Sequence, residues 1–377
     1  SPPYVVLCSF KRLEVHEPGR YPGAPRIVLD LVDLPDRYDA LLFLAGDEPV
    51  FTGGEVAVTR KAVGAITELY SRLSDRRAAG PDVLRDFALQ VVWCMFAEDL
   101  GQIPAHRFTR LVEALLAAPG RSSADELGAM FTWLNDPSEE RPAHGMYAGT
   151  PYANGGLFAH AAHVHLEPDE LELLREACAF DWKRIQPAIF GSLLEGALGR
   201  EQQWALGAHY THEADIQKVV QPTIVRPWRE RIENVTTHAE AKAAQAEPMN
   251  YVVLDPACGS GNFLYVAYRE LRRLEHRLAQ REEDLRKREG LKEQGAFSLF
   301  FPLANMKGIE IESFAIALAR VTLWMAHKLA VDELDLQERT LPLVELSGLR
   351  RGDALRAPRF DQQPACRFCG EDCDGLH

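Results

Sequence analysis

The pattern of apolar and polar positions divides the chain into three parts, of which the first is short. Three short apolar runs, at Tyr4–Cys8, Leu13–His16 and Arg26–Leu31, are separated by prolines and glycines. Runs of this length between turn residues are typical of short strands. We therefore expect a small β-rich segment, to which we assign residues 1–37.

A helical periodicity replaces this pattern from about Gly54 to Leu198. Apolar residues recur at helical spacing in four stretches, at 62–73, 84–96, 108–116 and 171–177. Spacings of three and four residues place such side chains on one face of a helix. The aromatic residues Phe96, Trp182 and Phe190 are expected in its core. This pattern predicts a mostly helical connector domain over residues 38–200.

The third part, residues 201–377, alternates strand-like and helical patterns, which is typical of an α/β fold. The apolar run Tyr251–Leu254 leads into the glycine-rich stretch 255–263 (DPACGSGNF), and a second strand is expected at Met306–Glu312. A third strand is expected to end within residues 351–355 (RGDAL). Leucines at 271, 274, 278 and 285 extend the helix after the glycine-rich stretch.

The charged stretch between Tyr268 and Lys292 carries residues of both signs. Such a mixture predicts a solvated helix face. The alternative is that Arg272, Arg273 and Arg277 contact the backbone of DNA.

The glycine-rich stretch has a chemistry of its own. It lacks both the lysine of a P-loop and the spacing of a dinucleotide-binding turn. Gly259 and Gly261 have no side chains, so a ligand can lie against the backbone. Asp255, at the end of the predicted strand, can accept hydrogen bonds from a cationic amine. A ligand with a cationic amino-acid end suits this turn better than a phosphate.

The sequence DPACGSGNF resembles motif I of the adenine-N6 DNA methyltransferases, which bind S-adenosylmethionine. Upstream, GAHYT at 207–211 is similar to motif X of these enzymes, and Gly308-Ile309-Glu310 is similar to motif II. The resemblance implies a class I, Rossmann-like methyltransferase domain over residues 201–377 that contains motifs X, I, II and III.

By this resemblance, the residues that surround the methionine and sugar of the cofactor are Thr211, Asp255, Ala257, Gly259, Gly261 and Phe263. Glu310 is the expected ligand of the ribose hydroxyls. Glu312 competes for that role, and its alternative is to cap the next helix. Asp353 is the expected acceptor for the adenine amino group, as in motif III.

The helical part resembles the connector of the large MmeI-like methyltransferases, which include the type IIL restriction–modification enzymes and a methylase of the DISARM phage-defence systems. The phrases that carry this resemblance are 96–99 (FAED), 151–158 (PYANGGLF), 180–182 (FDW) and 187–191 (PAIFG). Type IIL enzymes also have a PD-ExK nuclease domain. Here Asp30 and Asp33 lack a following Glu-x-Lys, which argues against DNA cleavage by this chain.

No catalytic residue is assigned. The Pro-Pro-aromatic motif of the family does not follow Asp353, and we expect it beyond His377. Ser1-Pro2-Pro3-Tyr4 matches that motif by its letters. We reject it because it precedes a strand and because motif X stands directly before motif I, so motif IV should come last.

Composition and charge indicate the class of protein and the compartment in which it works. The chain has 377 residues, of which 46% are hydrophobic and 26% charged, as in globular proteins. No apolar run is expected to cross a membrane, and no signal peptide opens the chain. Seven cysteines without a regular framework favour a reducing, cytoplasmic location. The net charge of −13 suggests that the main surface for double-stranded DNA lies outside this chain.

Four metal-ligating residue types gather near the last residue, at Cys366, Cys369, Cys373 and His377. Cysteine and histidine suit tetrahedral zinc, and the Cys-x-x-Cys spacing lets two thiolates share one ion. A structural zinc site is therefore one interpretation, and a cysteine-bearing loop is the other.

Together these features predict a site-specific adenine-N6 DNA methyltransferase of a restriction–modification or phage-defence system, with S-adenosylmethionine as cofactor. Subunits of a defence system are further expected partners. Two alternatives stay open: a non-catalytic, cofactor-binding subunit of a defence complex, and a methyltransferase that acts on RNA or protein.

Overall fold

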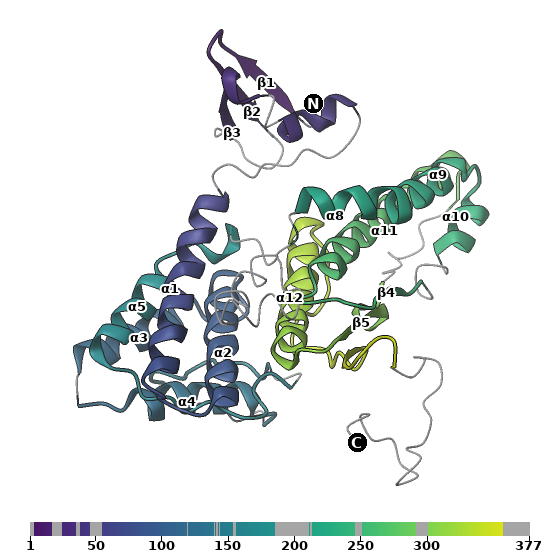
Figure 1. The fold of residues 1–377 in the computed structure, drawn as a ribbon. Helices are drawn as coiled ribbons and strands as arrows, with labels where there is room; N and C mark the ends of the chain where they lie inside the picture. The colour runs from purple at the N-terminus through teal and green to yellow at the C-terminus, as the bar shows by residue number, and fades with distance from the viewer. Residues whose placement is uncertain are drawn as a thin grey trace.

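The structure is a computed structural model. It describes residues 4–16, 25–34, 38–45, 55–184 (except 119, 139, 141, 143, 154 and 155), 211, 213–245, 251–291 and 301–356. Figure 1 shows a small β-sheet, a group of helices and an α/β part, in this order along the chain.

The first part is an antiparallel sheet of three strands, β1 (Val5–Cys8), β2 (Arg12–His16) and β3 (Pro25–Asp30), in the order β1-β2-β3. Alternate side chains of β2 and β3 point inward and pack against the 3-10 helix η2 (Tyr38–Ala45). The short 3-10 helix η1 (Leu31–Asp33) follows β3. The three strands predicted from the apolar runs are confirmed.

In the second part, the described residues form five α-helices: α1 (Glu55–Asp75), α2 (Pro81–Asp99), α3 (Arg107–Ala117), α4 (Ser123–Asn135) and α5 (Pro168–Cys178). The 3-10 helix η3 (Trp182–Arg184) follows. Helix α2 is apolar on nearly all sides from Leu84 to Ala97 and is buried accordingly. We call α1 to α5 the connector helices.

The phrase Phe96-Ala97-Glu98-Asp99 has a structural role in the connector helices. The Phe96 ring packs edge-on against Trp182, with ring centroids 4.9 Å apart. Glu98 caps α3, because its Oε1 accepts the N–H of Phe108 at 2.8 Å. Asp99 Oδ2 accepts the N–H of Trp182 at 2.6 Å. The expected core positions of Phe96 and Trp182 are confirmed, whereas Phe190 lies outside the described residues.

The third part contains a parallel sheet of three strands, β4 (Val253–Asp255), β5 (Met306–Glu310) and β6 (Leu349–Arg351), in the order β4-β5-β6. Helix α11 (Asn262–Arg288) connects β4 to β5, and α12 (Ser313–Glu333) connects β5 to β6. A short 3-10 helix, η7 (Leu303–Asn305), precedes β5. The two long helices contact each other and the strands that they connect, so they cover one face of the sheet.

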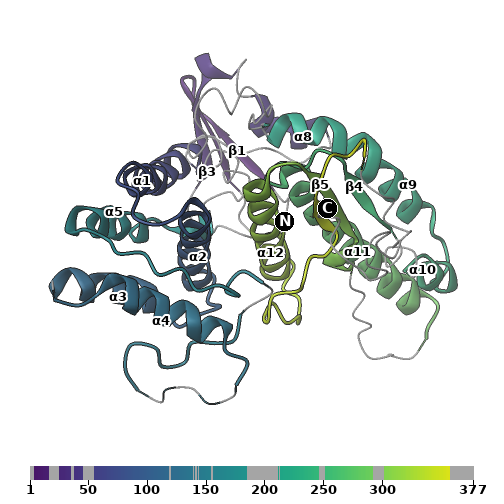
Figure 2. The same ribbon diagram turned by 60° about the horizontal axis from the view of Figure 1, so that its bottom comes forward.

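Three further helices pack along α11: α8 (Glu213–Val220), α9 (Arg226–Asn234) and α10 (His238–Gln245). One π-helical turn, η5 (Gln221–Val225), joins α8 to α9 and contains Pro222. Figure 2 shows these helices side by side with α11 at the outer edge of the α/β part.

The prediction of a solvated charged face on α11 is wrong for its central turns. The Arg272 side chain is only 1% exposed, and its guanidinium pairs with Glu275 at 2.9 Å and with Glu338. Arg273 pairs with Glu333 at 2.8 Å, near the end of α12. These cations therefore fasten α11 to α12 and to the segment after it, which leaves them poorly placed to contact DNA.

The expectation that no segment is long and apolar enough to cross a membrane also needs correction. Helix α12 meets that criterion by length and composition. However, 78% of its apolar window is buried among the other elements of the described chain, as is typical of a core helix.

Candidate functional site

The glycine-rich turn between β4 and α11 uses its two central glycines for different purposes. Both have positive φ angles, +52° at Gly259 and +83° at Gly261, which glycine adopts without steric cost. A Cβ on Gly261 would lie 3.0 Å from the Cβ of Ala319 in α12. A Cβ on Gly259 would meet no atom within 4 Å among the described residues. Gly261 therefore permits close helix packing, whereas Gly259 borders space that holds no atom of the described residues.

Cys258 anchors this turn to β5. Its N–H donates to the carbonyl oxygen of Ile309 at 3.1 Å. Its side chain is buried, and its Sγ would lie 2.7 Å from a Cβ on Gly308. Burial raises the pKa of this thiol well above its usual range, so it is a packing group and not a nucleophile.

Two carboxylates converge on the turn from the ends of neighbouring strands. Asp255 ends β4, and its Oδ1 accepts the N–H of Ala257 at 3.1 Å. Glu310 ends β5, and its Oε2 accepts the N–H of Gly259 at 3.0 Å. Oε1 of Glu310 accepts the N–H of Ile311 at 2.8 Å. Because the strands are parallel, their carboxyl ends meet at one edge of the sheet.

The same convergence changes the acidity of Asp255. Burial raises the pKa of this carboxyl, and the nearby charge of Glu310 raises it further, while the hydrogen bond from Ala257 acts in the opposite direction. A buried carboxylate near a like charge favours a cationic partner.

The two candidate glutamates occupy different positions, and the ribose-binding role of Glu310 stays a prediction. Strand β5 ends at Glu310, at the sheet edge beside the turn. Glu312 is the N-cap residue of α12, where its carboxylate accepts the N–H of Phe314 at 3.4 Å. The predicted second strand was therefore two residues too long, and the capping alternative for Glu312 is confirmed.

Asp353 lies two residues beyond the end of β6. The N–H of Gly352 donates to the Glu310 carbonyl oxygen at 2.8 Å, which places this segment at the same sheet edge. The Asp353 carboxylate accepts the N–H of Leu355 at 3.0 Å and pairs with Arg356 at 3.5 Å. Its role toward a ligand stays a prediction.

The other predicted residues lie around the turn or before α8. Ala257 is exposed at the tip of the turn. Phe263 is half-buried in the first turn of α11 and packs partly against the core. Thr211 is half-buried, and α8 begins two residues later, at Glu213. The rest of GAHYT, residues 207–210, lies outside the described residues.

One exposed apolar side chain at this edge was not predicted from the sequence. Ile311 directly follows Glu310 and is 56% exposed, and its carbonyl oxygen accepts a hydrogen bond from Arg351 Nε at 3.1 Å. The apolar pattern places Ile311 inside the predicted strand Met306–Glu312. Its exposure beside two carboxylates suits contact with a flat, apolar ring.

The predicted zinc ligands, Cys366 to His377, lie outside the described residues. Within the described ranges, no group of three or more His, Cys, Asp or Glu side chains could hold a metal ion. The four cysteines that the structure describes are free thiols: Cys8, Cys94, Cys178 and Cys258.

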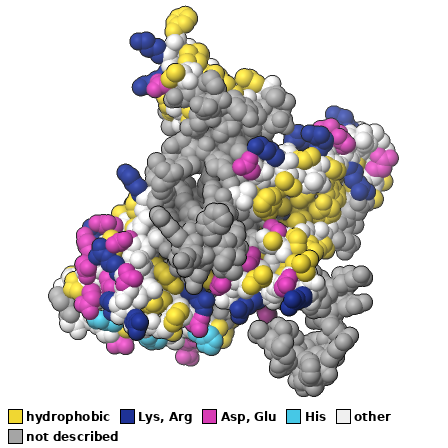
Figure 3. Space-filling view, in the orientation of Figure 1, with side chains coloured by type: hydrophobic (Ala, Val, Ile, Leu, Met, Phe, Trp, Pro, Cys, Tyr) yellow, Lys and Arg dark blue, Asp and Glu magenta, His cyan; other side chains and the backbone are white. Residues whose placement is uncertain are grey.

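The geometry therefore defines a sheet-edge site made of the Asp255 and Glu310 carboxylates, the Gly259 backbone and the apolar side chain of Ile311. Figure 3 shows one face of the molecule, where charged side chains of both signs mix over the connector helices and apolar side chains gather over the α/β part. This arrangement can bind a ligand that combines a cationic group, hydroxyls and an apolar ring.

Sequence profiles of one family match three successive stretches of the chain. The MmeI N-terminal domain matches residues 1–76, the MmeI helicase spacer domain residues 82–158, and the MmeI DNA-methyltransferase domain residues 233–368.

Two known proteins resemble the chain over most of its length. DNA methyltransferase A of Bacillus subtilis (strain 168) is 29% identical over an alignment of 350 residues that covers 88% of this chain and 38% of that protein. The structure of the type IIL restriction–modification enzyme MmeI in complex with DNA superposes with a TM-score of 0.69 at 29% identity, over 79% of this chain and 40% of that enzyme. The chain spans less than half the length of either protein.

Proposed function

Because the chain belongs to the MmeI-like methyltransferases, we propose that it binds S-adenosylmethionine and directs the methyl group to the exocyclic N6 amine of adenine in double-stranded DNA. The observation that carries this proposal is the sheet-edge site: Glu310 is hydrogen-bonded to Gly259, Asp255 lies at the same turn, and no described atom lies within 4 Å of a Cβ on Gly259. The matches to the MmeI domains and to MmeI bound to DNA support the choice of reaction and substrate.

The residues of the site fit the chemical groups of this cofactor. The pKa of the Asp255 carboxyl is raised in the free protein. A bound cationic amine would lower it again, because an opposite charge favours the ionised carboxylate. A carboxylate has about four acceptor positions. Glu310 fills three of them with the N–H groups of residues 259, 311 and 312, so its Oε2 can still accept from a ribose hydroxyl.

The remaining contacts follow from position. Thr211, Ala257, Gly261 and Phe263 complete the surroundings of the methionine and sugar. Ile311 offers an apolar surface to the adenine ring of the cofactor, and Asp353 accepts from its amino group. We propose that the three parallel strands and the helices α11 and α12 belong to a class I, Rossmann-like core.

When bound, S-adenosylmethionine supplies a methyl group that its sulfonium activates for attack by an amine. The contribution of this chain is to hold that methyl group in place, because holding two reactants in the right geometry supplies much of a rate enhancement. The groups that orient the target adenine are expected on a Pro-Pro-aromatic loop, and no residue of this chain is assigned to them.

The setting that we propose is a restriction–modification or phage-defence system in the cytoplasm, with double-stranded DNA as substrate and other defence subunits as partners. The three matched MmeI domains favour this setting over RNA or protein methylation.

The proposal is tested by the transfer of a radiolabelled methyl group to duplex DNA by the full-length protein. We expect incorporation into duplex DNA, recovered as N6-methyladenine, and loss of it in Asp255→Ala. Incorporation into single-stranded RNA or into protein, with none in DNA, would contradict the proposed substrate.

A further inference from the structure

The connector helices and the α/β part meet where α2 packs against the first turn of α12. Arg85 of α2 donates from Nη1 to Ser313 Oγ at 3.2 Å. The same nitrogen lies 3.7 Å from Glu312 Oε1. The Arg85 side chain is 26% exposed, and its second terminal nitrogen, Nη2, pairs with Asp82 on its own helix. Solvent therefore screens this contact less than an ion pair on the open surface.

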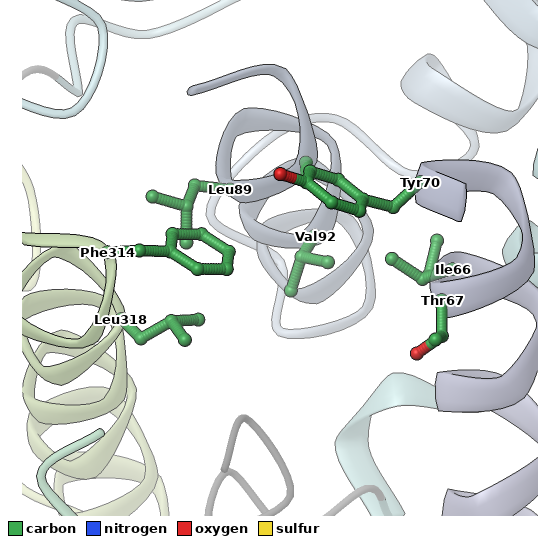
Figure 4. A pocket seen from close by; sticks show the side chains of 8 residues that line it. Ile66, Thr67, Tyr70, Leu89, Val92, Phe314 and Leu318 are labelled. Atoms are coloured by element: carbon green, nitrogen blue, oxygen red, sulfur yellow. The ribbon is translucent and has the colours of Figure 1, made fainter. Parts of the chain in front are cut away.

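Apolar packing supports the contact beside Arg85. The ring of Tyr70 in α1 stacks on the ring of Phe314 in α12, with centroids 6.3 Å apart and planes 13° from parallel. Figure 4 shows a small, mostly apolar pocket between these helices. It is lined by Ile66, Thr67, Tyr70, Ala88, Leu89, Val92, Phe314 and Leu318. The Arg85 contact therefore lies beside a packed interface between the two parts.

Short hydrogen-bonded steps connect Arg85 to the sheet-edge site. Glu312, which faces Arg85, donates its backbone N–H to Glu310 Oε1 at 3.1 Å. Its own carboxylate caps α12, as described above. The segment that Arg85 holds thus begins two residues after Glu310 and donates to the Glu310 carboxylate.

We propose that Arg85 is a positioning residue for Glu310, acting from the connector helices across their contact with α12. This inference rests on the proposed function, because it takes Glu310 to bind the ribose of the cofactor. Without Arg85, the residues that begin α12 lose a partner, and Glu310 must be ordered during binding. By thermodynamic reciprocity, a ligand held by Glu310 strengthens the contact between α2 and α12.

The test is calorimetric titration of the full-length protein with S-adenosylhomocysteine and with its 2′,3′-dideoxy analogue, which lacks both ribose hydroxyls. Arg85→Ala should bind S-adenosylhomocysteine about tenfold more weakly than the wild type, the size expected for one lost hydrogen bond from a charged group. Arg85→Lys keeps the charge and should bind with intermediate affinity. Both the wild type and Arg85→Ala should bind the dideoxy analogue equally.

The matched control is Arg110→Ala, which removes an exposed arginine of α3 and should bind as the wild type does. Circular dichroism establishes that each variant is folded. Equal affinity of Arg85→Ala and wild type for S-adenosylhomocysteine would overturn the inference, as would equal losses for both ligands. Failure of the wild type to bind S-adenosylhomocysteine would refute the proposed function, and this inference with it.

Discussion

The two glycines of the turn provide a paired test of the site. The same substitution should mainly lower the stability of the fold at Gly261 and mainly lower the affinity for the ligand at Gly259. Gly261→Ala adds a methyl group 3.0 Å from Ala319 at a φ of +83°. The left-handed conformation costs a non-glycine residue about 1–2 kcal/mol. Overpacking against Ala319 costs about 1–3 kcal/mol more. Alanine also lowers the conformational entropy of the unfolded chain, which stabilises the fold by about 0.7 kcal/mol. We expect a net loss of about 3 kcal/mol in the free energy of unfolding.

Gly259→Ala adds the same methyl group at a φ of +52°, where no atom of the described residues lies within 4 Å. Only the conformational cost remains, so the expected loss in the free energy of unfolding is about 1 kcal/mol. The new methyl group, however, occupies the space that the proposed ligand needs. Overpacking of the bound ligand by this methyl group should cost about 1.4 kcal/mol or more. Affinity for S-adenosylmethionine should therefore fall about tenfold or more.

Urea denaturation of both variants measures the first effect, and calorimetric titration measures the second. The reasoning is refuted if Gly261→Ala is as stable as Gly259→Ala, since the approach of Ala319 would then not restrict the turn. It is also refuted if Gly259→Ala binds the cofactor as the wild type does.

Three further predictions concern pH and packing. Burial raises the pKa of Glu275 from 4.5 to about 7, so its protonated form stabilises the fold fully below pH 4.5, and this contribution is lost as the pH rises through 7. The loss is about 3 kcal/mol at most, at about 1.4 kcal/mol per pH unit, and thermal unfolding of Glu275→Gln from pH 5 to 8 should lack this decline. Because burial raises the pKa of Asp255, S-adenosylmethionine should bind more weakly as the pH falls, beginning at a higher pH than for an ordinary aspartate. In Asp255→Asn, titrations across pH should lack that dependence. Gly308→Ala, whose Cβ would lie 2.7 Å from Cys258 Sγ, should lower stability by about 1–3 kcal/mol in urea denaturation, and Cys258→Ala should restore part of it.

Local sequence predicted the elements around the site well. An apolar run, a glycine-rich turn and a leucine-spaced helix are each local signals, and the structure has them as β4, the turn and α11. Helix α4 was not singled out, although Ser122 and Asp125 form a recognisable start: the Ser122 hydroxyl accepts the Asp125 N–H at 3.2 Å. The run of helices from α8 to α9 was not predicted, because proline usually interrupts a helix. Pro222 lies in the π-helical turn η5, and Pro227 lies in the first turn of α9, where proline is tolerated.

Features that depend on distant parts of the chain could not be predicted in this way. Arg272 has the surroundings of a surface residue in the sequence, and only the segment after α12 buries it against Glu338. Likewise, no local pattern connects Arg85 to Ser313, which is 228 residues away. The exposure of Ile311 depends on where β5 ends, and strand ends are the least predictable boundaries.

The measurement that tests the central claim most directly is calorimetric titration of the protein with S-adenosylmethionine, beside Asp255→Ala and the control Asp284→Ala. Asp284 is an exposed residue near the far end of α11. The account predicts saturable binding by the wild type and Asp284→Ala, and at least tenfold weaker binding by Asp255→Ala, as for the loss of a charged hydrogen-bonding partner. Equal binding by all three proteins, or no binding by the folded wild type, would contradict it.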